Sequence, residues 1–229
     1  MYLIAKWALL ILLVGALNAS AQSHLDICDE IIEVPLLKSD KIPNYVESYF
    51  TQYNVLEKIE LSKARFELRL YQYDSNIAYQ KAMILEINGS DVIISEHMVF
   101  SADNKDAQGQ YGFQMKSFKG HGVKDSLFIF YKMGRTLKNN CVKIKGVLKI
   151  LMENHLFDVP GEDNSLKLVD KKYPLLPALT TSTMIVELKV NSQFRKFYFR
   201  TMFDPEPTDI PEIRNKAKLL SAFNTIFKY

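Results

Sequence analysis

Apolar residues follow two different periods along this chain, and each period limits which element can form. Every second side chain in residues 66–70 is apolar, which is the period of a half-buried strand. A second run, 77–87, follows a turn, and Asn88-Gly89 then gives a strong hairpin signal because both residues tolerate a positive φ. We therefore expect antiparallel strands over residues 66–94.

A helical period of three to four residues marks two principal helices, at about 137–157 and about 211–227. The second follows Asp209 and Glu212, which are spaced as in a capping box. The stripe of the first helix is Leu137, Cys141, Ile144, Leu148, Leu151 and His155. The stripe of the second is Ile213, Ala217, Leu220, Phe223 and Phe227.

Two further strand patterns complete the predicted layout. Residues 127–133 are typical of a buried strand, and 184–201 of a hairpin that turns at 191–193. The order of strands, helix, strands and helix predicts an α+β fold, an antiparallel sheet with the two principal helices packed on it. A single domain over 22–229 is the simpler prediction; the alternative is a division into two subdomains near residue 160.

The first 21 residues have the layout of a secretory signal peptide. Lys6 supplies a positive charge, residues 7–17 are apolar, and residues 19–21 give the small-x-small pattern that signal peptidase reads. The apolar run is well short of the roughly 20 residues that span a bilayer, which argues against a retained anchor. We expect cleavage between Ala21 and Gln22 and a secreted or periplasmic mature chain.

Export also decides how the two cysteines, Cys28 and Cys141, are interpreted. Thiols pair in an oxidising compartment, so we predict a Cys28–Cys141 disulfide. A lipid-modified Cys28 is the competing interpretation, but Asp26 and Ile27 stand where a lipobox requires small side chains. Two free thiols are the third interpretation, and export disfavours it.

The composition excludes several classes of partner and site. The formal charge of +3 becomes nearly neutral when Lys6 leaves with the signal peptide, whereas nucleic-acid binding requires a concentrated basic face. No later apolar run reaches spanning length, so we expect no transmembrane segment in the mature chain. The chain has no Gly-x-Ser-x-Gly elbow, His-Glu-x-x-His pair or Walker loop. We therefore predict no cofactor and no metal site, and favour a protein that is not an enzyme.

The alternative is an unrecognised hydrolase with a site around the glycine-rich loop at 97–125. There folding would bring His121 to Asp103, Asp106 or His97. A second candidate acid–base pair is His155 with Asp158, three residues later. For His155 the favoured interpretation is structural, a helix-end histidine close to the last carbonyls.

Aromatic and basic residues interleave on the last predicted hairpin. An exposed face of Tyr and Arg is a favoured protein-binding surface. The candidate binding surface therefore contains Arg195, Tyr198 and Arg200, together with the loop residue His121. The alternative is that these are strand residues of high β-propensity that pack against helices.

Several short motifs resemble a known group of proteins. They are the exported start, Phe-Glu-Leu-Arg-Leu at 66–70, Leu-Phe-Asp-Val-Pro at 156–160 and Phe-Arg-Lys-Phe-Tyr-Phe-Arg at 194–200. The chain is similar in these to uncharacterised secreted proteins of Bacteroidota. The resemblance implies a bacterial, exported α+β protein and transfers no activity. The functional expectation is an exported, non-catalytic binding or cell-envelope-associated module.

Overall fold

The computed structural model describes residues 23–39, 50, 56–73, 79–101, 116–119, 127–138, 140–159, 171–172, 182–201 and 209–227. The signal peptide prediction, including the Ala21–Gln22 cleavage site, lies outside these residues. The first elements are the strands β1 (Ser23–Ile27) and β2 (Glu30–Val34), the 3₁₀ helix η2 (Ile59–Leu61), and the strands β3 (Phe66–Tyr73), β4 (Tyr79–Asn88) and β5 (Asp91–Ser101). They are followed by β6 (Lys116–Lys119), β7 (Leu127–Leu137), the helix α4 (Cys141–Glu153), β8 (Ser182–Val190), β9 (Gln193–Thr201) and the helix α6 (Pro211–Phe227).

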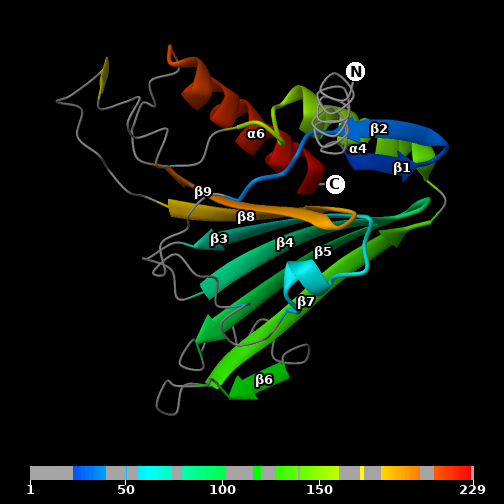
Figure 1. Cartoon of the computed structure of the whole chain (residues 1–229). Helices are drawn as coiled ribbons and strands as arrows, with labels where there is room; N and C mark the ends of the chain where they lie inside the picture. The colour runs from blue at the N-terminus through cyan, green and yellow to red at the C-terminus, as the bar shows by residue number, and fades with distance from the viewer. Residues whose placement is uncertain are drawn as a thin grey trace, which may run out of the picture.

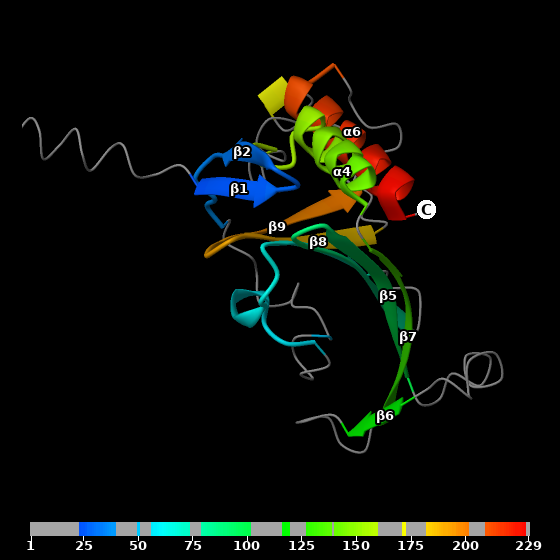
Figure 2. The ribbon, with the colours of Figure 1, turned by 90° about the vertical axis from the view of Figure 1, so that its right-hand side faces the viewer.

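The described strands form two antiparallel sheets. The larger has seven strands in the order β6-β7-β5-β4-β3-β8-β9, and the smaller is the β1–β2 hairpin. Helices α4 and α6 lie together on one side of the large sheet (Figures 1 and 2). The predicted α+β fold with two principal helices on an antiparallel sheet is confirmed.

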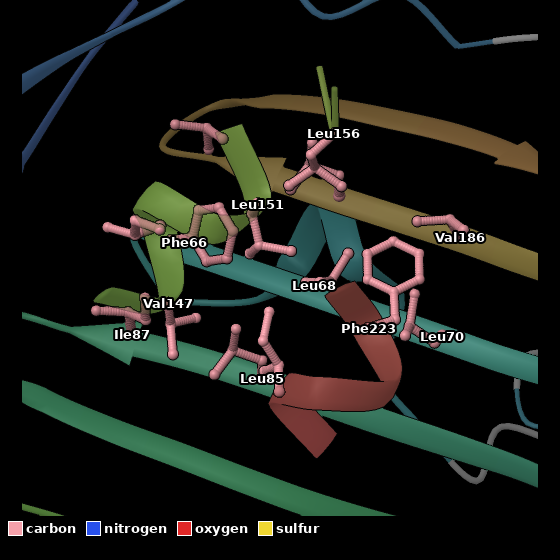
Figure 3. Close-up of a cluster of buried hydrophobic side chains, with 14 of the residues drawn as sticks. Phe66, Leu68, Leu70, Leu85, Ile87, Val147, Leu151, Leu156, Val186 and Phe223 are labelled. Atoms are coloured by element: carbon pink, nitrogen blue, oxygen red, sulfur yellow. The ribbon is translucent and has the colours of Figure 1, made fainter. Parts of the chain in front are cut away.

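The helix-covered face of the sheet carries the main hydrophobic core. Phe66, Leu68 and Leu70 of β3 are fully buried there, opposite α4 and α6 (Figure 3). The same cluster contains Leu151 of α4 and Phe223 of α6. The core therefore contains residues from before and after residue 160. The choice between one domain and two subdomains stays a prediction.

Helix α4 begins four residues later than the sequence pattern predicts. Strand β7 runs on to Leu137 instead of ending at Met133. The helix then starts where the side chain of Asn140 accepts a hydrogen bond from the backbone N–H of Lys143, at 3.1 Å. This side-chain cap, and not the apolar stripe, sets the first turn.

Helix α4 ends in a Schellman motif around His155. His155 has a positive φ of 67°. Its N–H bonds to Met152 O at 3.1 Å, and the next N–H, of Leu156, bonds to Leu151 O at 3.1 Å. The buried pair of Leu151 and Leu156 supplies the hydrophobic contact that accompanies this motif.

Helix α6 spans the predicted residues but presents a somewhat different face to the core. Ile213 and Phe223 are buried as expected. Leu219, Ala222 and Ile226 are also buried, and the predicted Leu220 and Phe227 are partly buried and pack against the core. The predicted stripe therefore misses Leu219, Ala222 and Ile226, and it includes Ala217, which is not part of the core cluster.

The disulfide between Cys28 and Cys141 is present, with a Cα–Cα distance of 5.5 Å. It joins the tight turn of the β1–β2 hairpin to the first residue of α4, across 113 residues of sequence. An ion pair of 2.7 Å between Glu30 Oε1 and Lys145 Nζ lies at the same junction. The hairpin is thus fixed to the helix layer.

Candidate functional site

On the face that the helices leave uncovered, β3 and β8 also bury their side chains, and charged residues lie there beside a second apolar cluster. Glu67, Arg69 and Tyr71 alternate with the core residues of β3 and point to this opposite face. Register brings Arg69 opposite Glu187 of β8, and Glu187 opposite Lys196 of β9. We call Glu67, Arg69, Tyr71, Glu187 and Lys196 the polar network.

Each charged group of the polar network is paired within it. Arg69 Nε bonds to Glu67 Oε1, and Arg69 Nη1 lies 4.0 Å from Glu187 Oε2. The Tyr71 hydroxyl donates to Glu187 Oε2 at 2.8 Å. Lys196 Nζ lies 3.0 Å from Glu187 Oε1. Since both glutamates are buried, these partners are what makes their burial tolerable.

The network also holds a chain segment, residues 56–65, which we call the strap. In Figure 2 the strap lies on the side of the sheet opposite α4 and α6. Arg69 Nη1 donates to the carbonyl of Glu57, and Lys189 Nζ donates to the carbonyl of Ser62. Ile59 of the strap is buried. Two buried cations therefore anchor the strap through its backbone.

Burial and charge shift two pKa values in the polar network. Burial of the Tyr71 hydroxyl, with the neighbouring Glu187 carboxylate, raises the pKa of Tyr71 well above its ordinary value. Burial alone would lower the pKa of Arg69, but the neighbouring Tyr71 and Glu67 raise it, and the net change is upward. Tyr71 therefore stays neutral and Arg69 stays charged, which suits a structural network better than a proton-transfer site.

The candidate binding surface predicted from the last hairpin is wrong at both positions whose side chains are described. Tyr198 is only 3% exposed and belongs to an aromatic cluster with Phe50 and Tyr71 under the sheet. Arg195 is 6% exposed on the helix side. Its guanidinium donates to Phe157 O at 2.8 Å and Val159 O at 2.6 Å.

The packing interpretation is therefore the correct one for Arg195 and Tyr198. Strand propensity and the layers on both sides of β9 explain these residues without a partner. The Arg200 side chain and His121 lie outside the described part of the chain, as do Asp103 and Asp106 of the proposed hydrolase loop.

Two histidines of the predicted acid–base sites, His97 and His155, each lie close to a polar side chain. His97 Nε2 lies 2.9 Å from Ser95 Oγ on β5, and both side chains are buried. Gly134 of β7 stands opposite Ser95 and is exposed. His155 Nδ1 lies 3.3 Å from Asp158 Oδ2 in an exposed pair. The backbone geometry of His155 supports its structural role at the end of α4.

Among the described residues, the two most exposed large apolar side chains lie close in sequence to the disulfide. Ile31 of β2 is 73% exposed and Val142 of α4 is 86% exposed. They directly follow Glu30 and Cys141, the residues that tie β2 to α4. We call the exposed residues of this junction the hairpin surface: Asp26, Asp29, Glu30, Ile31, Glu33 and Val142.

The sequence interpretation missed the hairpin surface, although its signal was present. Residues 26–33 read Asp-Ile-Cys-Asp-Glu-Ile-Ile-Glu, with four acidic residues in eight. The apolar periods assign residues 26–33 to no element, so the sequence does not show which of these acidic residues are neighbours. Only the hairpin, whose turn is at Cys28 and Asp29, brings them together.

The chain matches no family model, no curated protein and no solved structure in the three comparisons made. The resemblance to secreted proteins of Bacteroidota therefore stays a prediction. Among the described residues, no group of His, Cys, Asp and Glu side chains could hold a metal ion. In the same part of the chain, no helix is long and apolar enough to cross a membrane.

Proposed function

We propose that the mature chain is an exported, non-catalytic binding module of the cell envelope or its exterior, and that it binds through the hairpin surface. The observation that carries this proposal is the exposure of Ile31 and Val142 at a junction fixed by a disulfide. Large apolar side chains exposed on a rigid support and surrounded by polar groups are typical of protein-binding surfaces.

The proposal also depends on export, which a mass measurement of the secreted or periplasmic protein can test. We expect a mature chain that begins at Gln22 and contains no free thiol. A mass that retains residues 1–21, or a chain found only in the cytoplasm, would contradict it. Because the disulfide requires an oxidising compartment, thiol labelling of the unreduced, denatured protein is an independent check.

Binding through the hairpin surface can be tested with a photo-crosslinking amino acid in intact producing cells. Placed at Ile31, it should give one discrete crosslinked species, and Glu33→Lys should abolish that species. Leu61 of the strap is the matched control because it is also apolar and 63% exposed. Equal crosslinking from positions 31 and 61, or none from position 31, would refute the proposal.

A hydrolase is a second candidate, at residues other than the predicted His121 site, because Ser95 Oγ and His97 Nε2 lie within hydrogen-bond distance in a buried position. A neutral His97 could take the Ser95 proton as the hydroxyl attacks an ester carbonyl, and return it to the leaving alcohol. A fluorophosphonate probe should then label Ser95 and not Ser90. Ser95→Ala should remove the label, while Ser90→Ala should keep it. An unlabelled wild-type protein would exclude this candidate.

A further inference from the structure

Among the described residues, no strand pairs with the outer edge of β2. Within the described residues the small sheet contains only β1 and β2. The other edge, along β1, is closed by side chains: Asn191 Nδ2 donates to His24 O at 2.7 Å, and Arg65 Nη1 donates to Asp26 O at 3.2 Å. An edge strand without such cover is a template for another strand.

The register shows which groups lie along that edge. Cys28 and Asp29 both have positive φ, 54° and 61°, as in a two-residue turn. Such a turn makes Ile27 and Glu30 a hydrogen-bonded pair, and the pairs alternate from there. Ile31, opposite Asp26, therefore directs its N–H and C=O away from β1.

Glu33, opposite His24, lies in the same phase as Ile31. The bonds that Asn191 and Arg65 make to His24 and Asp26 agree with this alternation, because they reach those carbonyls from outside the hairpin. Two residues of β2 thus offer backbone groups to an added strand.

The charge around this edge selects the partner. Asp26, Asp29, Glu30 and Glu33 are all exposed, and within the described part of the chain Asp26 pairs with Arg65 and Glu30 with Lys145. Exposed pairs of this kind contribute little. A second copy of this chain would bring another set of the same carboxylates to the edge, and like charges on neighbouring strands are destabilising. A basic strand would be attracted.

We propose that the partner is an extended, basic protein segment that adds to β2 as a third antiparallel strand, with an apolar side chain beside Ile31. This inference rests on the proposed function and names the partner class and the binding mode of the same surface. The backbone hydrogen bonds of Ile31 and Glu33 provide the contact, while the acidic residues select for Lys and Arg.

The probe is a fluorescent synthetic peptide that alternates Lys and Val, measured by anisotropy with the oxidised mature protein. We expect saturable binding that weakens as salt rises from about 50 to about 500 mM. Two control peptides separate the contributions. One replaces Lys with Glu, and the other keeps Lys but carries N-methyl groups on alternate backbone amides. Each should bind at least about tenfold more weakly, a loss of about 1.4 kcal/mol.

The matched protein variant is Ile31→Pro, which removes an outward N–H and no β1–β2 hydrogen bond. It should reduce peptide affinity about tenfold with little change in thermal unfolding, whereas Ile31→Thr should keep most of the affinity. Asp29→Lys with Glu33→Lys should reduce both the affinity and the salt dependence.

Several results would overturn the inference. They are equal binding of the N-methylated peptide, full affinity of Ile31→Pro, no binding of the Lys–Val peptide up to millimolar concentration, or a dimer of the mature chain in sedimentation. If crosslinking at Ile31 still gives its discrete species in any of these cases, the hairpin surface binds in another way. If that crosslink is also absent, the proposed function itself fails.

Discussion

The side chains on the two faces of strand β3 are both buried, but different forces stabilise them. On the helix side, the side chains of β3 are Phe66, Leu68 and Leu70, and they contact other apolar residues. On the strap side, the same strand contributes Glu67 and Arg69 to the polar network. One strand therefore takes part in an apolar core and in a set of buried ion pairs.

This difference predicts how much stability a substitution on each face should cost. Loss of an apolar side chain costs its transfer free energy and leaves a cavity, and neighbouring residues relax to limit the cost. Loss of one member of a buried ion pair leaves a charge without compensation, and relaxation helps much less. Glu67 is already only partly compensated, because its Oε2 has no hydrogen-bond partner in the described part of the chain.

The strongest test of the comparison is Arg69→Met, which removes the central cation and keeps most of the volume. Glu67 and Glu187 lose a partner and the strap loses an anchor, so we expect a loss of about 3–5 kcal/mol in the free energy of unfolding. Denaturant unfolding at pH 7 measures it. Arg65→Met is the control, since Arg65 and Asp26 are exposed and 4.0 Å apart, and it should cost about 0.5 kcal/mol.

A second substitution separates repulsion from lost packing. Arg69→Met combined with Glu67→Leu removes the buried carboxylate as well, and it should recover part of the stability that Arg69→Met loses. If the double variant is less stable than Arg69→Met by the full cost of a new core substitution, the polar network does not behave as coupled charges. The two faces would then differ in composition alone.

On the helix side the corresponding test is Leu68→Ala, at the centre of the core shown in Figure 3. We expect a loss of about 3 kcal/mol, from burial and the cavity left behind. Leu61→Ala at an exposed position of the strap should stay within about 0.5 kcal/mol. A Leu68→Ala cost larger than that of Arg69→Met would reverse the order that the comparison predicts.

The helix side was predictable from sequence, and the strap side was not. Alternation in β3 and the helical stripe of α4 are local patterns, and each shows which residues face a core. The same alternation predicts that Glu67 and Arg69 face solvent, because it is the pattern of a half-buried strand. Their burial depends on the strap and on Glu187, more than a hundred residues away in sequence.

A weaker signal for the polar network was present in β8. Glu187 is the one acidic residue in the run Met-Ile-Val-Glu-Leu-Lys-Val, in a strand that is otherwise mostly apolar. A charge inside such a run can mark a buried pair, but the partner cannot be named before the strand order is known. The hairpin surface was missed for a similar reason, since Asp26 and Glu33 share a face with Ile31 only once the Cys28–Asp29 turn forms.

The smallest effect, and the most specific, is expected from Tyr71→Phe. It removes the hydroxyl that donates to Glu187 Oε2 and leaves Lys196 on the other oxygen. Since hydrogen bonds to charged groups contribute about 1.5–3 kcal/mol, we expect a loss of about 2 kcal/mol in the free energy of unfolding at pH 7.

The sign of the pH dependence is fixed by the raised pKa of Tyr71 in the folded protein. Its contribution to stability is complete below pH of about 10, where an unfolded tyrosine titrates, and falls as the pH rises further.

Ultraviolet titration can isolate that contribution among the twelve tyrosines of the chain. In native protein the absorbance change between about pH 9 and 11 should be the same for wild type and Tyr71→Phe, because the buried hydroxyl does not ionise there. In urea the wild type should show one tyrosine more. If the native curves also differ by one tyrosine, Tyr71 ionises in the folded protein and solvent reaches its hydroxyl. The polar network would then not be closed to solvent, and the comparison with the helix side would fail.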